Sequence, residues 1–410
     1  MAQDIAGDWQ GTLKVEAQEL RIVLQIAMRD NGGWKAMMYS IDQSSDAIPV
    51  NSIALEGSNL KLTVDAVQGT YAGKVSTDGN SIAGTWAQGA PLPLTLRRAT
   101  KETAWQLDPA AAHTVQFITV DNDVKLEVLD WGGSGRPLVL LTGLGGGAHV
   151  YDKFAPKLIA SYHVYGITRR GFGASSAPAT GYTADRLGDD VLAVLDALKL
   201  NRPVLVGHSL GGEEMSSVGS RHPERVAGLI YLDCYGYAYY DRLHGYLFVD
   251  AAELQKKLSL LQSGTGQQDP KQFVQGLLET SLPAFERDVR ELQKDFQAQP
   301  AAMVAGWSAP RPAVSQAIYA GMQKYTDIPV PILAIFAVPH ELGPEAGNDP
   351  IVRAAVEARD EAWAGAQAKA FETGVPTARV VRLPHANHNV FLSNEADVLR
   401  EMNAFLKSLP

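Results

Sequence analysis

The sequence has a single cysteine, no long apolar run and no cluster of basic residues, and each absence excludes a class of protein. Cys234, alone among 410 residues, permits neither an intramolecular disulfide nor a metal site built from several cysteines. No apolar stretch reaches the ~18 residues of a membrane-spanning helix. Basic residues run no further than doublets and the net charge is −9, so we expect no nucleic-acid partner.

The first residues also lack the features of an export signal. Neither a basic segment nor an apolar segment follows Met1. Ala2-Gln3-Asp4 nevertheless resembles a mature terminus left after signal cleavage, with Met1 added for expression. Both an exported and a cytoplasmic location therefore stay open.

Residues 1–100 have the pattern of a small all-β domain. Short runs of alternating apolar and polar residues are separated by turn residues such as those at 31–33 and 78–80. We predict about seven or eight antiparallel strands in a barrel or sandwich. Its tryptophans are expected to pack in the core; they are Trp9, Trp34 and Trp86.

From residue 115 to 410 the pattern becomes that of a doubly wound, mostly parallel α/β domain. Short β-branched runs, of the kind buried on both faces of a parallel sheet, alternate with helical patterns. A helical cap is predicted at 235–327 and a linker at 101–114. The strand-like runs are 115–120, 124–129, 137–141, 162–167, 204–206, 229–232, 331–336 and 378–383, and the main helical patterns are 182–198, 211–222, 285–296 and 394–409.

The most informative motif is Gly-x-Ser-x-Gly at residues 207–211. It follows an apolar run and precedes a helical pattern, which is the context of a nucleophile held on a sharp strand-to-helix turn. Gly207 and Gly211 leave the space that this turn needs. The helix N-terminus directs N–H groups toward the serine oxygen. Ser209 is therefore the candidate nucleophile.

A serine nucleophile requires a general base, and the chain offers one at the end of its last predicted strand. Residues 378–383 lead into His385 and His388, at the sheet edge where the strand before Ser209 also ends. We predict His388 as the base. His385 is expected on the surface of a loop, and His208 is expected to pack beside the nucleophile.

These motifs resemble those of the α/β-hydrolase superfamily, in its branch of capped serine hydrolases and carboxylesterases. Residues 207–212 match the family's elbow, residues 170–175 resemble its Arg-Gly-x-Gly-x-Ser loop, and His388 falls at its terminal histidine. The resemblance covers about residues 113–410 and implies an α/β-hydrolase fold with a catalytic triad. Residues 1–100 lie outside it, as a β-rich extension.

The carboxylate of the implied triad has two candidates. In this family it usually follows the strand after the cap, where the spacing places His340 and then Glu341. Some capped members place it at the end of the strand before the cap, and Asp233 fits that position. Asp233 is preferred, with Glu341 as the alternative. Either carboxylate would orient His388 and stabilise its imidazolium.

The oxyanion hole is predicted from the backbone N–H groups of Leu144 and Leu210. Thr142 and Gly143 stand where relatives have His-Gly, and a backbone donor survives that change of side chain. The glycine-rich residues 143–147 match neither the Walker A nor the full dinucleotide pattern. We therefore expect no nucleotide, no other cofactor and no catalytic metal.

Together these residues predict a serine hydrolase that cleaves carboxylic esters through an acyl-enzyme intermediate. A serine at the elbow argues against haloalkane dehalogenase and epoxide hydrolase chemistry, which related folds perform with aspartate. Lactones, amides and thioesters stay open as substrates, as does the oligomeric state. Aromatic residues of the cap suit a small ester with a hydrophobic or aromatic group; they are Tyr235, Tyr237, Tyr239, Tyr240, Phe248, Trp307 and Tyr319.

Two other classes of function stay open. A receptor with the same fold would bind a small ligand with little turnover, and residues 1–100 could act as a separate binding module. A receptor would bind ligand without a burst of product. A binding module would bind its target as residues 1–105 alone.

Overall fold

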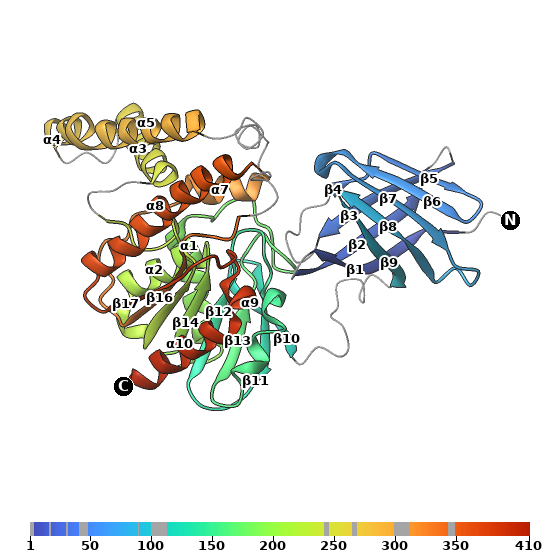
Figure 1. Cartoon of the computed structure of the whole chain (residues 1–410), viewed down its shortest axis with the longest axis horizontal. Coiled ribbons are helices and arrows are strands. Elements are labelled where there is room, and N and C mark those ends of the chain that lie inside the picture. Colours follow the sequence, from blue (N-terminus) through green and yellow to red (C-terminus); the bar gives the residue numbers. More distant parts are fainter. Residues whose placement is uncertain are drawn as a thin grey trace. The chain divides into compact units, whose positions relative to one another are not determined.

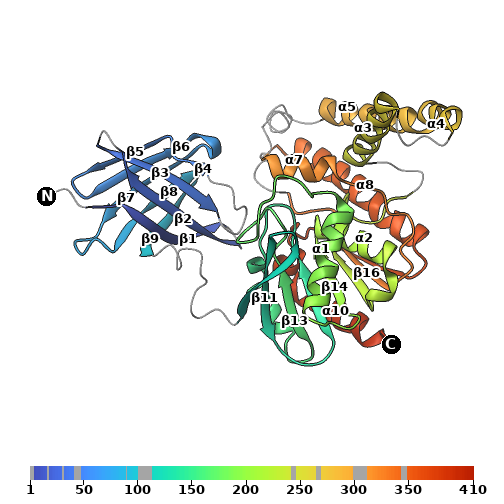
Figure 2. The same ribbon diagram turned by 180° about the vertical axis from the view of Figure 1, so that it is seen from behind.

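The computed structural model describes residues 4–15, 18–29, 32–40, 48–88, 90–99, 113–241, 246–264, 269–298, 312–342 and 349–410. The chain contains two sheets, an antiparallel sheet A drawn in blue and a mixed sheet B drawn from teal to red (Figures 1 and 2). It divides into two compact units. The first holds residues 1–132, 145–159 and 166–177, and the second holds residues 133–144, 160–165 and 178–410.

Sheet A has nine antiparallel strands in the order β4-β3-β2-β1-β9-β8-β7-β6-β5, in which two runs of consecutive strands join where β1 pairs with β9. It is a single sheet curved into a half-barrel, so it has the barrel type of architecture and is not a two-sheet sandwich. It has more strands than predicted, because the two-residue β4 is too short to show a periodic pattern. The strands are β1 (Gly7–Val15), β2 (Gln18–Met28), β3 (Trp34–Ser40), β4 (Ile48–Pro49), β5 (Ser52–Glu56), β6 (Asn59–Val64), β7 (Gly69–Val75), β8 (Ser81–Gln88) and β9 (Ala90–Ala99).

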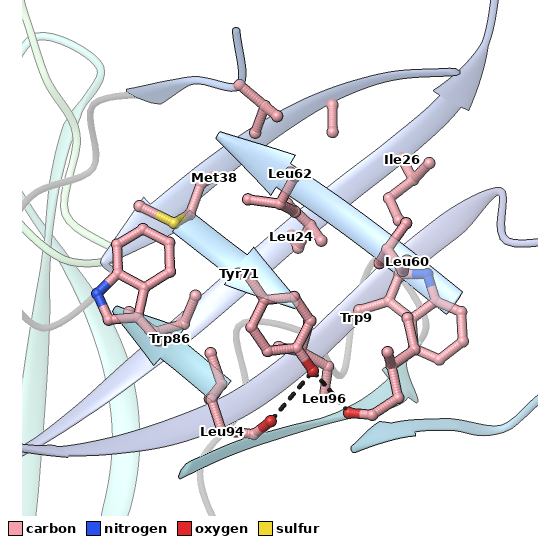
Figure 3. Close-up of a cluster of buried hydrophobic side chains, with 14 of the residues drawn as sticks. Trp9, Leu24, Ile26, Met38, Leu60, Leu62, Tyr71, Trp86, Leu94 and Leu96 are labelled. Atoms are coloured by element: carbon pink, nitrogen blue, oxygen red, sulfur yellow. Dashed lines mark hydrogen bonds between the residues drawn. The ribbon is translucent and has the colours of Figure 1, made fainter. Parts of the chain in front are cut away.

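One face of sheet A is filled by a core of aromatic and aliphatic side chains (Figure 3). Trp9 and Trp86 are buried in this core and Trp34 packs against it, which confirms the prediction that the tryptophans are core residues. The hydroxyl of buried Tyr71 donates to the carbonyl of Ile82 at 2.9 Å, so the one polar atom of this ring keeps a partner inside the apolar core.

Sheet B has eight strands in the order β10-β11-β13-β12-β14-β15-β16-β17. β10 and β11 form an antiparallel hairpin, and β12, β14, β15, β16 and β17 pair in parallel. This confirms the predicted α/β fold. The strands are β10 (Thr114–Asp121), β11 (Val124–Gly132), β12 (Pro137–Leu141), β13 (His163–Ile167), β14 (Val204–His208), β15 (Gly228–Leu232), β16 (Ile332–Ala337) and β17 (Ala378–Leu383).

Helices cover both faces of the parallel strands. Tyr231 of β15 contacts Ser216 of α2 and Phe371 of α8, so these two helices share one face. A Cβ at Gly228 of the same strand would meet Phe405 of α10 at 3.1 Å, which places α10 on the other face, because neighbouring residues alternate. The helices outside the insertion are α1 (Ala184–Ala197), α2 (Gly211–Arg221), α8 (Pro350–Gly374), α9 (Val390–Ser393) and α10 (Glu395–Ser408), with short turns η1 (Asp65–Val67), η2 (Ala148–Tyr151), η3 (Ala155–Lys157) and η4 (Pro223–Arg225).

The expectation of burial on both faces is wrong for β10. Val115 and Phe117 are 39% and 53% exposed, whereas Ile118 is buried. The strand turns back into β11 after Asp121 and lies at the edge of the sheet, so only one of its faces is covered. The strands from β12 to β16 are buried as predicted.

The described chain between β15 and β16 is helical, within the region predicted as a cap, and is called the helical insertion below. Trp307 lies outside the described residues. Among the described helices, none combines the length and apolar character needed to cross a membrane. The helices of the insertion are α3 (Leu247–Ser263), α4 (Pro270–Gly276), η5 (Leu277–Ser281), α5 (Leu282–Ala298) and α7 (Ala313–Ala320).

Candidate active site

Ser209 lies on the tight turn between β14 and α2. Its backbone has a φ of +50°, in the left-handed region that side chains with a Cβ disfavour and that is enriched at functional sites. A Cβ at Gly207 would lie 2.8 Å from the carbonyl carbon of Gly211, so the turn requires glycine there. The serine is 95% buried, at the carboxyl end of a central strand.

The loop after β12 borders this turn, because β12 and β14 are neighbours in the sheet. A Cβ at Gly143 would lie 3.2 Å from the Cβ of Ser209. Within the described residues, neither Leu144 nor Leu210 donates a backbone hydrogen bond to another group of the protein. Both N–H groups remain available to a bound oxygen atom.

The imidazole of His388 is partly exposed and contacts the carboxylate of Asp233. Its Nδ1 lies 2.6 Å from Oδ2 of Asp233, which directly follows β15 and is fully buried. Burial raises the pKa of Asp233, but hydrogen bonds from His340 and His388 outweigh it and hold the pKa below its ordinary value. Because an ionised carboxylate only accepts hydrogen bonds, Nδ1 of His388 carries a proton toward it.

Glu341, the alternative carboxylate, is exposed and makes no described side-chain contact with His388. Its backbone N–H donates to the carbonyl of Ala386 at 2.9 Å. Of the two candidate acids, the structure brings Asp233 to His388 and leaves Glu341 at the surface. The described hydrogen bonds do not include one between the Ser209 hydroxyl and His388; such bonds often tighten only when substrate binds.

The two other histidines near the turn occupy different environments. His208 is buried, with Nε2 3.0 Å from the carbonyl oxygen of His388, and the two rings lie 4.6 Å apart. Burial lowers the pKa of His208 to about 3, so this ring is neutral and donates from Nε2. The side chain of His385 is 64% exposed. His208 thus packs beside the nucleophile turn, and His385 lies on the surface.

His340, which stands at the family's usual acid position, bridges two carboxylates. Its Nε2 lies 2.7 Å from Oδ2 of Asp233, and its Nδ1 lies 2.9 Å from Oδ2 of Asp360 on α8. Both ring nitrogens face acceptors, so both carry protons. Burial lowers the pKa of His340, but the two carboxylates more than offset this and raise it to about 10.

This bridge explains how a histidine can replace an acid without changing the charge beside His388. The carboxylates of Asp233 and Asp360 and the imidazolium of His340 together carry one net negative charge, as a lone aspartate would. Asp233, His340 and His388 lie close enough to share a metal ion. Both ring nitrogens of His340 are, however, already hydrogen-bonded to carboxylates.

The bridge predicts a loss of stability at alkaline pH. The pKa of His340 is raised from 6.5 to about 10 on folding, so its contribution is complete below pH 6.5 and is lost as the pH rises toward 10. In urea titrations the free energy of unfolding should fall over that range in the wild type, and less steeply in His340→Gln. Equal pH slopes in the two proteins would show that His340 is not a cation stabilised by folding.

Most described aromatic residues of the insertion fall into two groups, whereas Tyr239 packs on Phe371 of α8 with the rings 5.5 Å apart. Tyr235 lies beside the site, with its ring 5.5 Å from His388 and 4.9 Å from Trp363 of α8. The side chain of Trp363 is 49% exposed. The other group packs together around a small core and includes Tyr237, Tyr240, Tyr246, Phe248 and Tyr319. The sequence pattern did not single out Asp360 or Trp363, which lie one helical turn apart on α8.

The strand order of sheet B, with Ser209, Asp233 and His388 each following one of its parallel strands, is that of the α/β-hydrolase fold. A sequence model of the alpha/beta hydrolase family matches residues 138–401. The chain belongs to this family.

Individual relatives match over shorter stretches. The 2-hydroxymuconate semialdehyde hydrolase of Pseudomonas sp. is 35% identical over 111 residues, 26% of this chain and 39% of that protein. The 2-(acetamidomethylene)succinate hydrolase of Mesorhizobium japonicum is 28% identical over 101 residues, 25% of this chain and 36% of that protein. The chain spans about two fifths of the length of the curated relatives it matches.

A likeness to solved structures extends over more of the chain. The crystal structure of E-2-(acetamidomethylene)succinate hydrolase covers 72% of this chain and 100% of its own, with a TM-score of 0.43 and 18% identity. The crystal structure of a bromoperoxidase from Bacillus anthracis covers 72% of this chain and 100% of its own, with a TM-score of 0.45 and 19% identity.

Proposed function

We propose that this protein is a serine hydrolase that cleaves carboxylic esters through an acyl-enzyme intermediate. The observation that carries the proposal is the 2.6 Å contact between Nδ1 of His388 and buried Asp233, at the sheet edge where the turn of Ser209 also lies. A histidine whose Nδ1–H is held by a carboxylate presents Nε2 as a base. Serine needs such a base to act as a nucleophile.

Each half of the reaction uses the same groups. Nε2 of His388 takes the proton of Ser209 while the serine oxygen attacks the ester carbonyl. The imidazolium then gives this proton to the leaving alcohol as the ester C–O bond breaks, and the acyl group stays on Ser209. Water attacks the acyl-enzyme with His388 again as base. The carboxylic acid departs, and Ser209 regains its proton.

Leu144 and Leu210 supply the N–H groups for the oxyanion in this proposal. Leu210 begins the first turn of α2 and is fully buried, so its N–H acts where water is largely excluded. A fixed donor in such surroundings stabilises developing charge more than water does, and losing one typically costs about 10²–10³ in rate. Because the donors are backbone N–H groups, neither Leu144 nor Leu210 needs a particular side chain. This agrees with the glycine-rich loop that follows β12.

The pair formed by Tyr235 and Trp363 supports a substrate with a hydrophobic or aromatic group. In Trp363→Ala, KM for a p-nitrophenyl benzoate ester should rise about 10-fold, equivalent to ~1.4 kcal/mol of lost binding, while kcat changes little. Trp363→Phe should recover much of the loss, because it restores an aromatic face. Steady-state kinetics would contradict this assignment if KM stayed unchanged or if kcat alone fell.

A rapid-mixing experiment tests the proposed function. With p-nitrophenyl esters of increasing acyl length, the wild type should release a burst of one p-nitrophenol per chain before slower turnover, because acylation precedes deacylation. A receptor with the same fold would bind the ester without a burst. Absence of both burst and turnover across acyl chain lengths, benzoates and lactones would overturn the proposal.

A further inference from the structure

A second cluster of chemistry-bearing side chains lies in the first compact unit, at His113, His149 and Asp152. Nδ1 of His113 lies 2.9 Å from Oδ1 of Asp152, and Nδ1 of His149 lies 3.5 Å from Oδ2 of the same carboxylate. One donor atom from each residue lies within 4.8 Å of the others. Two ligands of a tetrahedral zinc ion, each bound at about 2.0–2.2 Å, are separated by roughly 3.4 Å.

The two imidazoles are buried without complete hydrogen bonding. The side chain of His113 has no exposed surface, and neither of its ring nitrogens makes a hydrogen bond within the described residues. Nδ1 of His113 lies 2.9 Å from Oδ1 of Asp152 without forming a hydrogen bond of good geometry. Nδ1 of His149 is also buried and without a hydrogen bond. The two Nδ1 atoms face one carboxylate at 2.9 and 3.5 Å without completing a hydrogen bond to it, which is costly for buried polar atoms and points to a ligand.

His149 is already oriented as a metal ligand would be. Its Nε2 lies 3.0 Å from Oε1 of Glu127, which is 97% buried and also accepts a hydrogen bond from the Thr168 hydroxyl at 2.7 Å. The Nε2 proton therefore faces Glu127, and a metal ion that displaces the proton of Nδ1 would gain that nitrogen as a ligand beside Asp152. A carboxylate holding the far nitrogen of a metal-bound histidine is the usual arrangement in zinc sites.

Asp152 gives the cluster its negative charge and its access to solvent. Its Oδ1 accepts a hydrogen bond from the Trp131 indole at 3.2 Å, which fixes the carboxylate. Its side chain is 34% exposed, so an ion can enter from that side and keep water in a remaining position. Two imidazole nitrogens and one carboxylate oxygen form a donor set that suits Zn²⁺ and not Mg²⁺ or Ca²⁺, which favour oxygen alone.

We propose that His113, His149 and Asp152 bind one Zn²⁺ ion, with Glu127 holding His149 in position. His113 directly precedes β10, whereas the other two ligands lie in and after η2, between β12 and β13. The ion ties together two segments separated by more than 30 residues in the sequence. It therefore acts on folding stability, separately from the chemistry proposed at Ser209.

The test uses the full-length protein, stripped of metal with a chelator and titrated with Zn²⁺ by calorimetry. The wild type should bind one ion per chain with high affinity and gain thermal stability on binding. His113→Gln and Asp152→Asn should weaken binding at least 100-fold, and Glu127→Gln should weaken it 10–100-fold. Co²⁺ in the site should give the visible absorption of a four- or five-coordinate ion, which is a readout independent of enzymatic activity.

Two control variants make the outcome decisive. His222→Gln removes a half-exposed histidine 3.9 Å from Glu224 and should leave zinc binding unchanged. His340→Gln alters the cluster beside Ser209 and should also leave it unchanged. Asp152→Asn keeps the shape of a partly exposed side chain, so it remains informative if His113→Gln does not fold. Failure of the wild type to bind Zn²⁺, or loss of binding in His340→Gln alone, would overturn the proposal.

Discussion

Ser209→Ala is expected to lower kcat on p-nitrophenyl esters by about 10⁶-fold, the cost of removing the nucleophile from a serine hydrolase. The hydroxyl oxygen forms the covalent bond, so no neighbouring group can replace it. Alanine meets the same backbone strain at φ +50° as serine does, so the turn and the fold should survive. Initial rates, with thermal unfolding to verify the fold, measure the effect.

A matched control lies in the helix that follows. Ser217→Ala removes a hydroxyl that donates to Asp185 at 2.8 Å, on the same helix α2 but away from the turn. Ser217 is buried but contacts none of the groups proposed for the chemistry, so this variant should keep wild-type rates to within about twofold. Full activity in Ser209→Ala would exclude Ser209 as the nucleophile, whatever the behaviour of the control.

Asp233→Asn is expected to lower kcat by about 10⁴-fold, as the same change does in a serine protease triad. The amide keeps the shape of the side chain but loses the charge that stabilises the imidazolium of His388. It also removes one of the two carboxylates around His340. Asp360 still pairs with His340, so the free energy of unfolding should fall by less than the roughly 3–5 kcal/mol typical of a buried charge left without any partner.

Glu341→Gln is the matched control for the acid. Glu341 is exposed, and its side chain makes no described contact with His388, so this variant should retain activity to within about twofold. Rates are to be measured below the unfolding temperature of each variant, determined separately, so that lost stability is not mistaken for lost chemistry. A large effect of Glu341→Gln together with a small effect of Asp233→Asn would reverse the assignment.

Local sequence patterns predicted the elements around the site because each pattern is contiguous. The run at 204–206, the glycines around Ser209 and the helical pattern at 211–222 fall on β14, the turn and α2, whose ends differ by no more than two residues from those predicted. The position of His388 follows from the end of β17 in the same way. Such features depend on periodicity and turn geometry, which neighbouring residues determine.

Contacts between distant segments could not be predicted in this way. The choice between Asp233 and Glu341 depends on which carboxylate contacts His388. Asp233 and His388 are 155 residues apart in the sequence. Asp360 belongs to a 25-residue helix with no catalytic motif, and its contact with His340 exists only because α8 packs beside β16. His113 and His149 also come together only in the folded chain, so no spacing pattern in the sequence marks them as ligands.

The order of the site along the chain has a consequence for its synthesis. Ser209 and Asp233 follow neighbouring strands of one β14–α2–β15 unit, whereas His388 follows the last strand, β17. On the proposed mechanism, a growing polypeptide therefore holds its nucleophile and its acid well before it acquires a base. On that mechanism Ser209 would have no base until β17 joins the sheet, so ester hydrolysis would begin only after the last segment of the chain has been made.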